Sequence, residues 1–468
     1  NNRATGVYYN NLLQKWGISG PKRKAVIARL GLFRTLNQML EMYLPFFISD
    51  NSSKGFFQTP SIISDDFVPV IETFQGVGSL EYHRYSKKSG TTHQEVTNKV
   101  SKSAIFESPW PGLNLSWDPS TARNVFVQEM WMGPFHSLRR KIFSSLKLKH
   151  FFEVIKKSAT RPMKTDDDYD YPENLPLVKI NRLKSFRARE AAELMQVHGE
   201  DLLLSSMFCQ LYKELRQHSD EKLRVSYTHP MDDGQSRSFK IKFEGEGVDD
   251  YGGPYREIFQ QICIELQLLY PTEDNSRKPE CFLPLLMPAP NWHADGDISE
   301  KYVFMLNPNI SSDLKMDLVV FMGQLIGIAI RSRVTLDLAL PSFFWKVIVG
   351  ESLGEKDLAS FDKPAFEMIQ QLSLLYKQYQ EKGQVDSEEA LEAIRDLTWS
   401  ATLSHGEIVE LVPNGLQRPV LLPELGEFLT KYVTVRLNEN KQALRMLRKG
   451  LVSIIPESSL SLLNAEDL

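Results

Sequence analysis

The sequence predicts an α+β fold in which helices predominate. Apolar residues recur three or four positions apart through long stretches of the 468-residue chain, as the buried face of a helix requires. Strand signals are short by comparison, and two of them, LRVSYTH and SFKIKF, are separated by the turn-forming MDDGQS. From about Asp313 to the last residue one helical pattern follows another, and no fixed-period repeat indicates a solenoid or propeller.

The composition narrows the classes of function. With 42% apolar and 24% charged residues, the chain is expected to fold. Lys plus Arg is 55 and Asp plus Glu is 59, a net charge of −4 that argues against nucleic acid as the main partner. Three cysteines, an odd number, predict a reducing compartment, cytoplasmic or nuclear. No pattern predicts a metal or a cofactor.

The longest apolar run does not predict a membrane span. Residues 318–330 are apolar except for Gln324, but 13 residues fall short of the roughly 18 to 20 that cross a bilayer. Gly323 and Gly327 stand four apart on one face of this run, which predicts a core helix that lets a second backbone approach closely.

Three parts are expected along the chain. Residues 1–159 form a mostly helical region of unknown role, with an apolar stripe in Lys24–Ile48. Residues 160–176, TRPMKTDDDYDYPENLP, predict an exposed acidic linker rich in proline, and an acidic docking motif is the alternative. Residues 177–468 form the main domain. The opening NNRATG, without an initiator Met, indicates a piece of a longer protein.

Two elements are expected early in the main domain. A helix runs from about Asp201 to Gln217. In SFKIKF, Phe239, Ile241 and Phe243 face one side and the two lysines face the other, as in a half-buried strand.

The densest local motif is FEGEGVDDYGGPYREIF, residues 243–259. A strand leads into a loop with four glycines, and Pro254 opens a helix whose buried stripe is Ile258, Ile262, Leu266 and Leu269. A phosphate-binding loop is excluded, because the glycine spacing is wrong and four carboxylates would repel an anion. A cation site on those carboxylates is the alternative to a structural loop in which Asp249 or Asp250 caps N–H groups and the glycines adopt positive φ.

Five segments together resemble the HECT-type ubiquitin ligases. They are the glycine-rich motif above, FMLNPN (304–309), FMGQLIGIAI (321–330), LDLALPSFFWK (336–346) and KDLASFD (356–362), in the order and spacing of that family. The resemblance covers residues 177–468 and is closest to the very large family members. It implies the amino-terminal lobe of a two-lobed transferase, with a helical large subdomain, short antiparallel strands and a small partner-docking subdomain at 352–427.

The resemblance also implies a reaction. The family recruits a ubiquitin-charged conjugating enzyme, accepts ubiquitin on a cysteine in a Thr-Cys-Phe context, and passes it to a substrate lysine. Cys209 and Cys263 lie on apolar helical faces and Cys281 follows a loop, all outside that context. The chain is therefore expected to hold no catalytic residue, and the carboxy-terminal catalytic lobe is expected beyond Leu468. The fragment alone is then inactive.

The expected site is a docking surface for the conjugating enzyme. In 366–379 and again after Pro423, apolar residues form two stripes, whereas a helix packed on one side needs only one. The resemblance aligns MIQQLSLL with the family's groove helix and an aromatic pair with its docking pair. The candidate partner-binding residues are Phe428, Tyr432, Met368, Leu372, Leu375 and Trp399. The alternative is that all six belong to the core.

We therefore expect a HECT-type ubiquitin-protein ligase fragment that binds a charged conjugating enzyme, with protein substrates held by regions not identified. Two alternatives stay open. The chain could be a non-catalytic scaffold that retains the fold, or an independent enzyme that uses Cys281 as its nucleophile.

Overall fold

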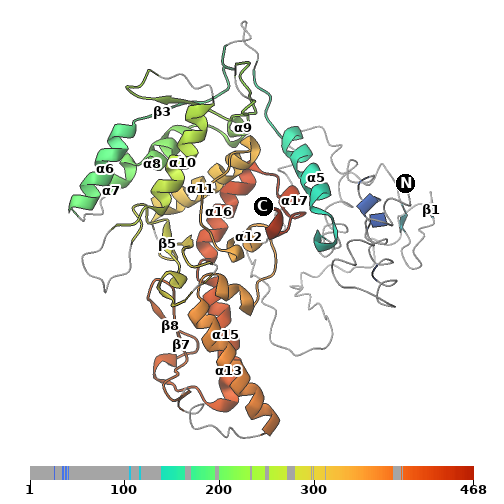
Figure 1. Cartoon of the computed structure of the whole chain (residues 1–468), viewed down its shortest axis with the longest axis vertical. Coiled ribbons are helices and arrows are strands. Elements are labelled where there is room, and N and C mark those ends of the chain that lie inside the picture. Colours follow the sequence, from blue (N-terminus) through green and yellow to red (C-terminus); the bar gives the residue numbers. More distant parts are fainter. Residues whose placement is uncertain are drawn as a thin grey trace, which may run out of the picture. The chain divides into compact units, whose positions relative to one another are not determined.

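The computed structural model describes most of the chain after residue 138 and only scattered positions before it (Figure 1). The gaps after residue 138 are 164–169, 196–199, 232–233, 248–251, 271–279, 297, 299, 311, 383–391 and 393. The chain divides into two compact units. The first comprises Asn1–Tyr43 with Thr73–Ile142, and the second Leu44–Glu72 with Phe143–Leu468.

The first unit is described at few positions. Six positions between Val26 and Glu41 are helical, within the stretch predicted as a helix, and the rest of that stretch lies outside the described residues. A short antiparallel pair joins β1 (Ile105–Phe106) to β2 (Leu115–Ser116), where no strand was predicted. The predicted domain boundaries stay predictions.

The second unit is built mainly of helices. They are α5 (Ser144–Lys157), α6 (Arg182–Met195), α7 (Glu200–Ser205), α8 (Met207–Leu215), α9 (Asp220–Leu223), α10 (Gly253–Gln267), α11 (Asp313–Ser332), α12 (Ser342–Ile348), α13 (Lys363–Lys382), α15 (Leu425–Asn438), α16 (Lys441–Ile454) and α17 (Glu457–Leu460). Short 3-10 helices join them: η5 (Pro290–His293), η6 (Glu355–Ser360), η7 (Gly415–Gln417), η8 (Leu422–Glu424) and η9 (Ala465–Asp467). The predominantly helical α+β class is confirmed.

The strands of this unit form two-stranded sheets. β5 (Leu286–Pro288) pairs with β6 (Phe304–Leu306), and β7 (Ser400–Thr402) pairs with β8 (Ile408–Glu410), both antiparallel as expected. β3 (Leu177–Ile180) and β4 (Lys240–Phe243), however, are parallel. Parallel neighbours need a long crossover, and α6 to α9 supply it.

Of the two runs predicted to form strands on either side of MDDGQS, only the second forms a continuous strand. In the second, Phe239, Ile241 and Phe243 are buried, as the alternation predicted, with Ile241 and Phe243 in β4. The first forms no continuous strand: Tyr227 bridges Arg237, and Val225 bridges Thr160. The first run is thus held by single bridges, whereas β4 pairs with the distant β3 along its whole length.

The helix predicted over 201–217 is interrupted at Ser206. The Ser206 hydroxyl accepts a hydrogen bond from the Cys209 N–H (3.1 Å) and caps α8. The Met207 and Phe208 N–H groups donate to the carboxylate of Glu265 at 3.1 and 3.0 Å, and the Ser185 hydroxyl donates to it as well. Burial raises the pKa of Glu265. A carboxylate from α10 therefore fixes the start of α8.

The glycine-rich motif is a structural loop where it is described. Gly245 and Gly252 have φ of 80° and 101°, which favours glycine, and Pro254 lies in the first turn of α10. Asp249 and Asp250 lie outside the described residues. Glu246 binds Arg182, and Glu244 accepts a hydrogen bond from Asn181 at 3.1 Å. No group of acidic, histidine or cysteine side chains in the described part of the chain could hold a metal ion.

Helices α11 and α16 form the centre of the unit, side by side in Figure 1. A Cβ at Gly323 would lie well inside 3.0 Å of the Leu447 carbonyl oxygen, and a Cβ at Gly450 equally close to that of Val320. The predicted close approach at Gly323 is confirmed. No described helix combines the length and apolarity needed to cross a membrane.

The segment 160–176, predicted as an exposed linker, is packed at its second described end, whereas Arg161, Pro162 and Met163 at the first end are exposed. Leu175 is buried, and Asn174 donates a hydrogen bond to the Arg161 carbonyl (3.0 Å). The Tyr171 ring stacks on His229, with Lys240 3.7 Å from its centroid. Aromatic and amide side chains make these contacts. The linker prediction rested on the acidic and proline residues of the segment and did not take the aromatic and amide residues into account. The acidic stretch 164–169 lies outside the described residues.

Candidate functional site

The candidate site lies in a small subdomain, residues 352–438, made of η6, α13, β7, β8, η7, η8 and α15. Figure 1 shows α13 and α15 packed along each other, with β7 and β8 beside them. A Cβ at Gly426 would lie 2.6 Å from the Tyr376 ring, so the glycine lets the two helices approach closely. The expected end of the subdomain at Glu427 falls inside α15, which begins at Leu425.

Three of the six candidate residues form an aromatic series. The ring centroids of Trp399 and Phe428 are 5.9 Å apart, and those of Phe428 and Tyr432 are 5.8 Å apart. Trp399 and Phe428 are each 1% exposed and Tyr432 is 8% exposed. Burial raises the pKa of the Tyr432 phenol. These rings pack on one another beneath the surface.

The three candidates on α13 line the same core. Leu372 and Leu375 are buried, and Met368 is half-buried and packs against them. The structure thus brings all six residues into one apolar cluster, with Met368 and Tyr432 nearest to solvent. Burial agrees with the core interpretation for Trp399, Phe428, Leu372 and Leu375, because a side chain without exposed surface cannot touch a partner in this conformation.

Two cations cover the Trp399 ring. The Arg418 guanidinium lies 5.2 Å from the ring centroid, and the Lys431 ammonium lies 5.6 Å from it. The segment that carries Arg418 pairs with the tryptophan's own segment: the Trp399 N–H donates to the Arg418 carbonyl (3.1 Å), and the Val420 N–H donates to Leu397 (2.9 Å). Residues 415–421 are thereby fixed beside the aromatic series.

A buried arginine joins the ends of the subdomain. Arg436 on α15 donates to the Asp362 carboxylate (2.7 Å), to the Thr402 carbonyl (2.9 Å) and to Glu439 (3.3 Å). Burial alone would lower the pKa of Arg436, but Glu439 and Asp362 raise it. Because each donor has a partner, the charge holds α13, β7 and α15 together.

Residues 286–468 match the HECT-domain (ubiquitin-transferase) family. Residues 286–468 are thus similar to a HECT domain. The chain is 27% identical over 345 residues to the E3 ubiquitin-protein ligase HERC2 of Mus musculus, an alignment that covers 73% of this chain and 6% of that protein. It is 28% identical over 294 residues to the probable E3 ubiquitin-protein ligase HECTD4 of Homo sapiens, covering 58% and 7%. The chain thus spans a small fraction of these relatives' length.

The three cysteines of the chain, all before the matched region, are buried and form no disulfide. Burial raises the pKa of the Cys209 and Cys263 thiols to about 11 and that of the Cys281 thiol to about 12. The thiolate is the nucleophilic form, and burial disfavours it at all three positions. The sequence predicted this for Cys209 and Cys263. Burial of Cys281, although it lies close to a loop, argues against the alternative of an independent enzyme that uses this thiol.

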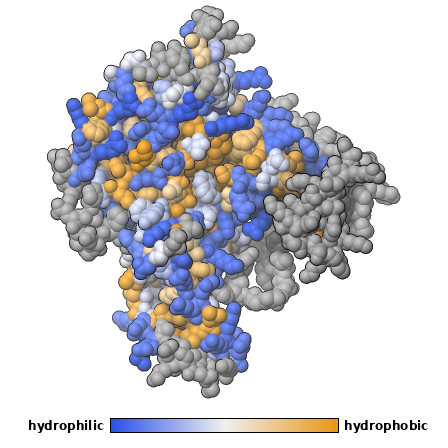
Figure 2. Space-filling model, viewed as in Figure 1, coloured by the Kyte–Doolittle hydropathy of each residue, from blue (hydrophilic) through white to orange (hydrophobic). Residues whose placement is uncertain are grey.

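The small subdomain also exposes apolar side chains that the sequence had not singled out. Leu416 and Leu421, 48% and 57% exposed, stand at either end of the segment that pairs beside Trp399, and Leu374 and Ile408 are exposed elsewhere in the subdomain. Figure 2 shows apolar side chains at the surface of this region, the lower part of the view. Leu416 and Leu421 lie within VPNGLQRPVLLPE, a stretch rich in proline and polar residues, and apolar residues in such a stretch could have indicated an exposed apolar surface.

Proposed function

We propose that this chain is part of a HECT-type ubiquitin-protein ligase and that its small subdomain recruits a ubiquitin-charged conjugating enzyme. In the reaction, a cysteine thiolate other than those of Cys209, Cys263 and Cys281 attacks the thioester carbonyl of the charged enzyme, whose own thiolate leaves. A substrate lysine amine then attacks the new thioester and releases the cysteine. Protein substrates bind through other regions, and the protein works in the cytoplasm or the nucleus.

The family match over residues 286–468 is the observation that carries this proposal. The names of the relatives, all ubiquitin-protein ligases, favour transfer over a non-catalytic scaffold. The state of the cysteines fits a division of labour: the chain docks a partner, and a cysteine other than Cys209, Cys263 or Cys281 accepts ubiquitin. The described part contributes shape and apolar surface rather than reacting groups.

The docking surface is proposed on the exposed side of the aromatic series. Leu416 and Leu421 supply apolar contact, with Tyr432 and Met368 at its edge, while Trp399 and Phe428 support it from beneath. Burying one leucine side chain contributes roughly 1.5–3 kcal/mol. Two such anchors, with rim contacts, support an encounter in the micromolar range, near −8 kcal/mol. A transfer cycle needs a partner that dissociates.

Binding of a panel of ubiquitin-charged conjugating enzymes to the chain tests the proposal. We expect saturable binding to some of the panel, weakened at least tenfold in the double variant Leu416→Ser/Leu421→Ser. Both leucines are already exposed, so the fold should persist, and circular dichroism checks it. The matched control is Leu183→Ser, an equally exposed leucine on α6 outside the subdomain. Equal binding by the double variant and wild type would place docking elsewhere, and no binding at all would reject the recruitment proposal.

A further inference from the structure

Helix α6, at one edge of the second unit in Figure 1, turns its large apolar side chains to solvent. Its inner face carries Ser185, Ala188 and Ala192, which are 0%, 5% and 2% exposed. Its outer face carries Leu183 and Phe186, which are 57% and 49% exposed. A surface helix normally turns its large apolar residues toward the core. The reversed order indicates that a further surface covers the outer face of α6.

Bonds from the inner face fix which side of α6 faces outward. The Arg182 guanidinium, at the start of the helix, binds the carboxylates of Glu246 and Glu257. The Ser185 hydroxyl donates a hydrogen bond to the buried carboxylate of Glu265. These contacts join α6 to α10 and to the loop before it. A rotation of α6 that buried its two large apolar side chains would break them.

The outer face also carries two cations and two anions, in an order that opposes the helix dipole. Lys184 and Arg187 stand in the first half of α6 and are exposed. Glu190 and Glu193 stand in the second half and are exposed as well. The dipole favours the reverse order, with anions near the amino end and cations near the carboxyl end. The stability of α6 alone therefore does not account for the arrangement of these charges.

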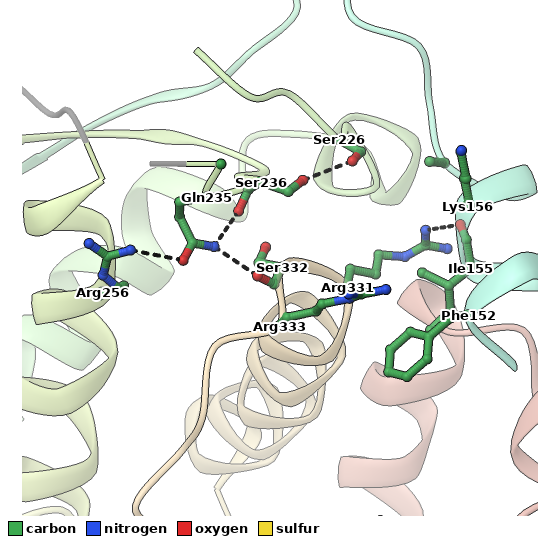
Figure 3. A pocket seen from close by; sticks show the side chains of 12 residues that line it. Phe152, Ile155, Lys156, Ser226, Gln235, Ser236, Arg256, Arg331, Ser332 and Arg333 are labelled. Carbon is green, nitrogen blue, oxygen red and sulfur yellow. Dashed lines mark hydrogen bonds between the residues drawn. The ribbon is translucent and has the colours of Figure 1, made fainter. Parts of the chain in front are cut away.

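Within the described part of the chain, these four charged groups have no ion-pair partner. The buried Arg331 is different. In the pocket of Figure 3 it donates a hydrogen bond to the Ile155 carbonyl (2.9 Å), and its other donors are paired as well. The fold thus satisfies the charge of Arg331, whereas it leaves the charges on the outer face of α6 to water or to a partner.

A second copy of α6, laid in the antiparallel direction, complements this face. Leu183, Arg187 and Glu190 stand at i, i+4 and i+7, so they form the centre line of the outer face. With a twofold axis between positions 188 and 189, Arg187 of each copy lies level with Glu190 of the other, and the symmetry forms this ion pair twice. The cationic half of each helix then lies beside the anionic half of the other, and the two dipoles oppose each other. A parallel pair would place like charges side by side.

We propose that two copies of the chain associate through the outer faces of α6, antiparallel about a twofold axis. The paired Arg187 and Glu190 side chains occupy the centre of the interface, and Leu183 and Phe186 of each copy supply apolar contact toward its two ends. Two 14-residue helices bury less than the roughly 1,200 Å² of a standard interface, so the dimer is reversible and forms at micromolar concentration. The face lies outside the small subdomain, so the inference does not depend on recruitment of a conjugating enzyme.

Sedimentation velocity of the chain over a range of micromolar concentrations tests the proposal. We expect wild type to shift from monomer to dimer as the concentration rises. Phe186→Ser should weaken the association at least tenfold, and so should Arg187→Glu and Glu190→Arg, because each of these two sets like charges opposite each other. The substituted positions are exposed, so the fold should persist, and circular dichroism checks it. The matched control is Lys449→Glu, at an exposed lysine on α16, which should associate like wild type.

Mixing the two charge variants tests whether the ion pairs join two copies. Arg187→Glu and Glu190→Arg should each stay monomeric alone, and their equimolar mixture should form a dimer, because each variant restores the ion pairs of the other. Leu183→Cys tests the direction of the helices. In an antiparallel pair the two substituted positions lie about 16 Å apart along the helices, too far for a disulfide, whose Cα atoms lie within about 7 Å.

Four results would overturn the proposal. The first is a monomer at every concentration. The second is a dimer that persists in Phe186→Ser and in both charge variants, which would place the contact on another surface. The third is a mixture of the charge variants that stays monomeric. The fourth is a disulfide between two copies of Leu183→Cys, which would make the helices parallel. Weaker self-association of Leu183→Ser, with unchanged binding of a charged conjugating enzyme, would support the proposal independently of recruitment.

Discussion

His150, in the middle of α5, is a histidine that the fold keeps neutral. Burial, and then Lys157, lower its pKa from 6.5 to about 4, and its Nδ1 is buried without a hydrogen-bond partner in the described part of the chain. Because the folded pKa is depressed, the unfolded chain binds a proton between pH 6.5 and 4 that the folded chain does not. Stability therefore falls as the pH falls through this window, by about 2–3 kcal/mol from this group.

The substitution His150→Leu should remove that part of the pH dependence. We expect the free energy of unfolding of the variant to fall less than that of wild type between pH 6.5 and 4.5, as measured by urea denaturation at each pH. His293→Gln, at an exposed histidine in η5, is the control and should follow wild type. Parallel pH curves for His150→Leu and wild type would show that His150 is protonated in the folded chain.

Single residues also show what a sequence can and cannot indicate. Lys147 has no exposed surface and binds the equally buried carboxylate of Asp467, 320 positions along the chain. Burial alone would raise the pKa of Asp467, but the bond from Lys147 helps to lower it. Nothing near Lys147 in the sequence indicates this partner. In contrast, the apolar helical surroundings of Cys209 and Cys263 were enough to predict inert thiols.

At the scale of elements, the crossing of α11 and α16 depends on glycine from both helices. A Cβ at Gly450 would overlap the Val320 carbonyl oxygen, which belongs to a backbone that cannot turn aside. We expect Gly450→Ala to destabilise the chain by about 1–3 kcal/mol or more, although alanine favours helix, because the helices must separate. Gly253→Ala, where a Cβ meets nothing within 4 Å, is the control.

Thermal and urea unfolding of both variants measure this effect. A melting temperature of Gly450→Ala equal to wild type would mean that α16 can shift without loss of stability.

The spacing of Gly323 and Gly327 predicted this crossing, because two glycines on one apolar face indicate a close neighbour. The sequence did not identify α16 as that neighbour. It also missed the break between α7 and α8, since Glu265 on α10 supplies the acceptor for the N–H groups there.

At the scale of the whole molecule, the separation of core from docking surface decides how the proposed function can be tested. The periodicity of the apolar residues predicted that some surface covers Met368, Leu372, Leu375, Phe428 and Tyr432. In the structure all five lie in or against the apolar core. The periodicity could not distinguish a partner from the chain itself, because a second apolar stripe looks the same whether another protein or a neighbouring segment covers it. Here η8 and the segment beside Trp399 cover it.

Phe428→Ala is the variant that separates the two roles. Phe428 is 1% exposed and lies between Trp399 and Tyr432, so its truncation leaves a cavity in the core of the small subdomain. We expect a loss of about 3–5 kcal/mol in the free energy of unfolding, measured by urea denaturation followed by tryptophan fluorescence, to which Trp399 contributes. Leu421→Ser, at an exposed position, should cost little stability.

The two variants should therefore separate stability from binding. Phe428→Ala should lose stability first, and it should bind a charged conjugating enzyme only as far as the subdomain stays folded. Leu421→Ser should stay folded and bind more weakly. The reverse pattern, in which Phe428→Ala keeps wild-type stability but loses binding, would mean that the aromatic series opens to receive the partner. The cations over Trp399, Arg418 and Lys431, would then be the groups that move aside.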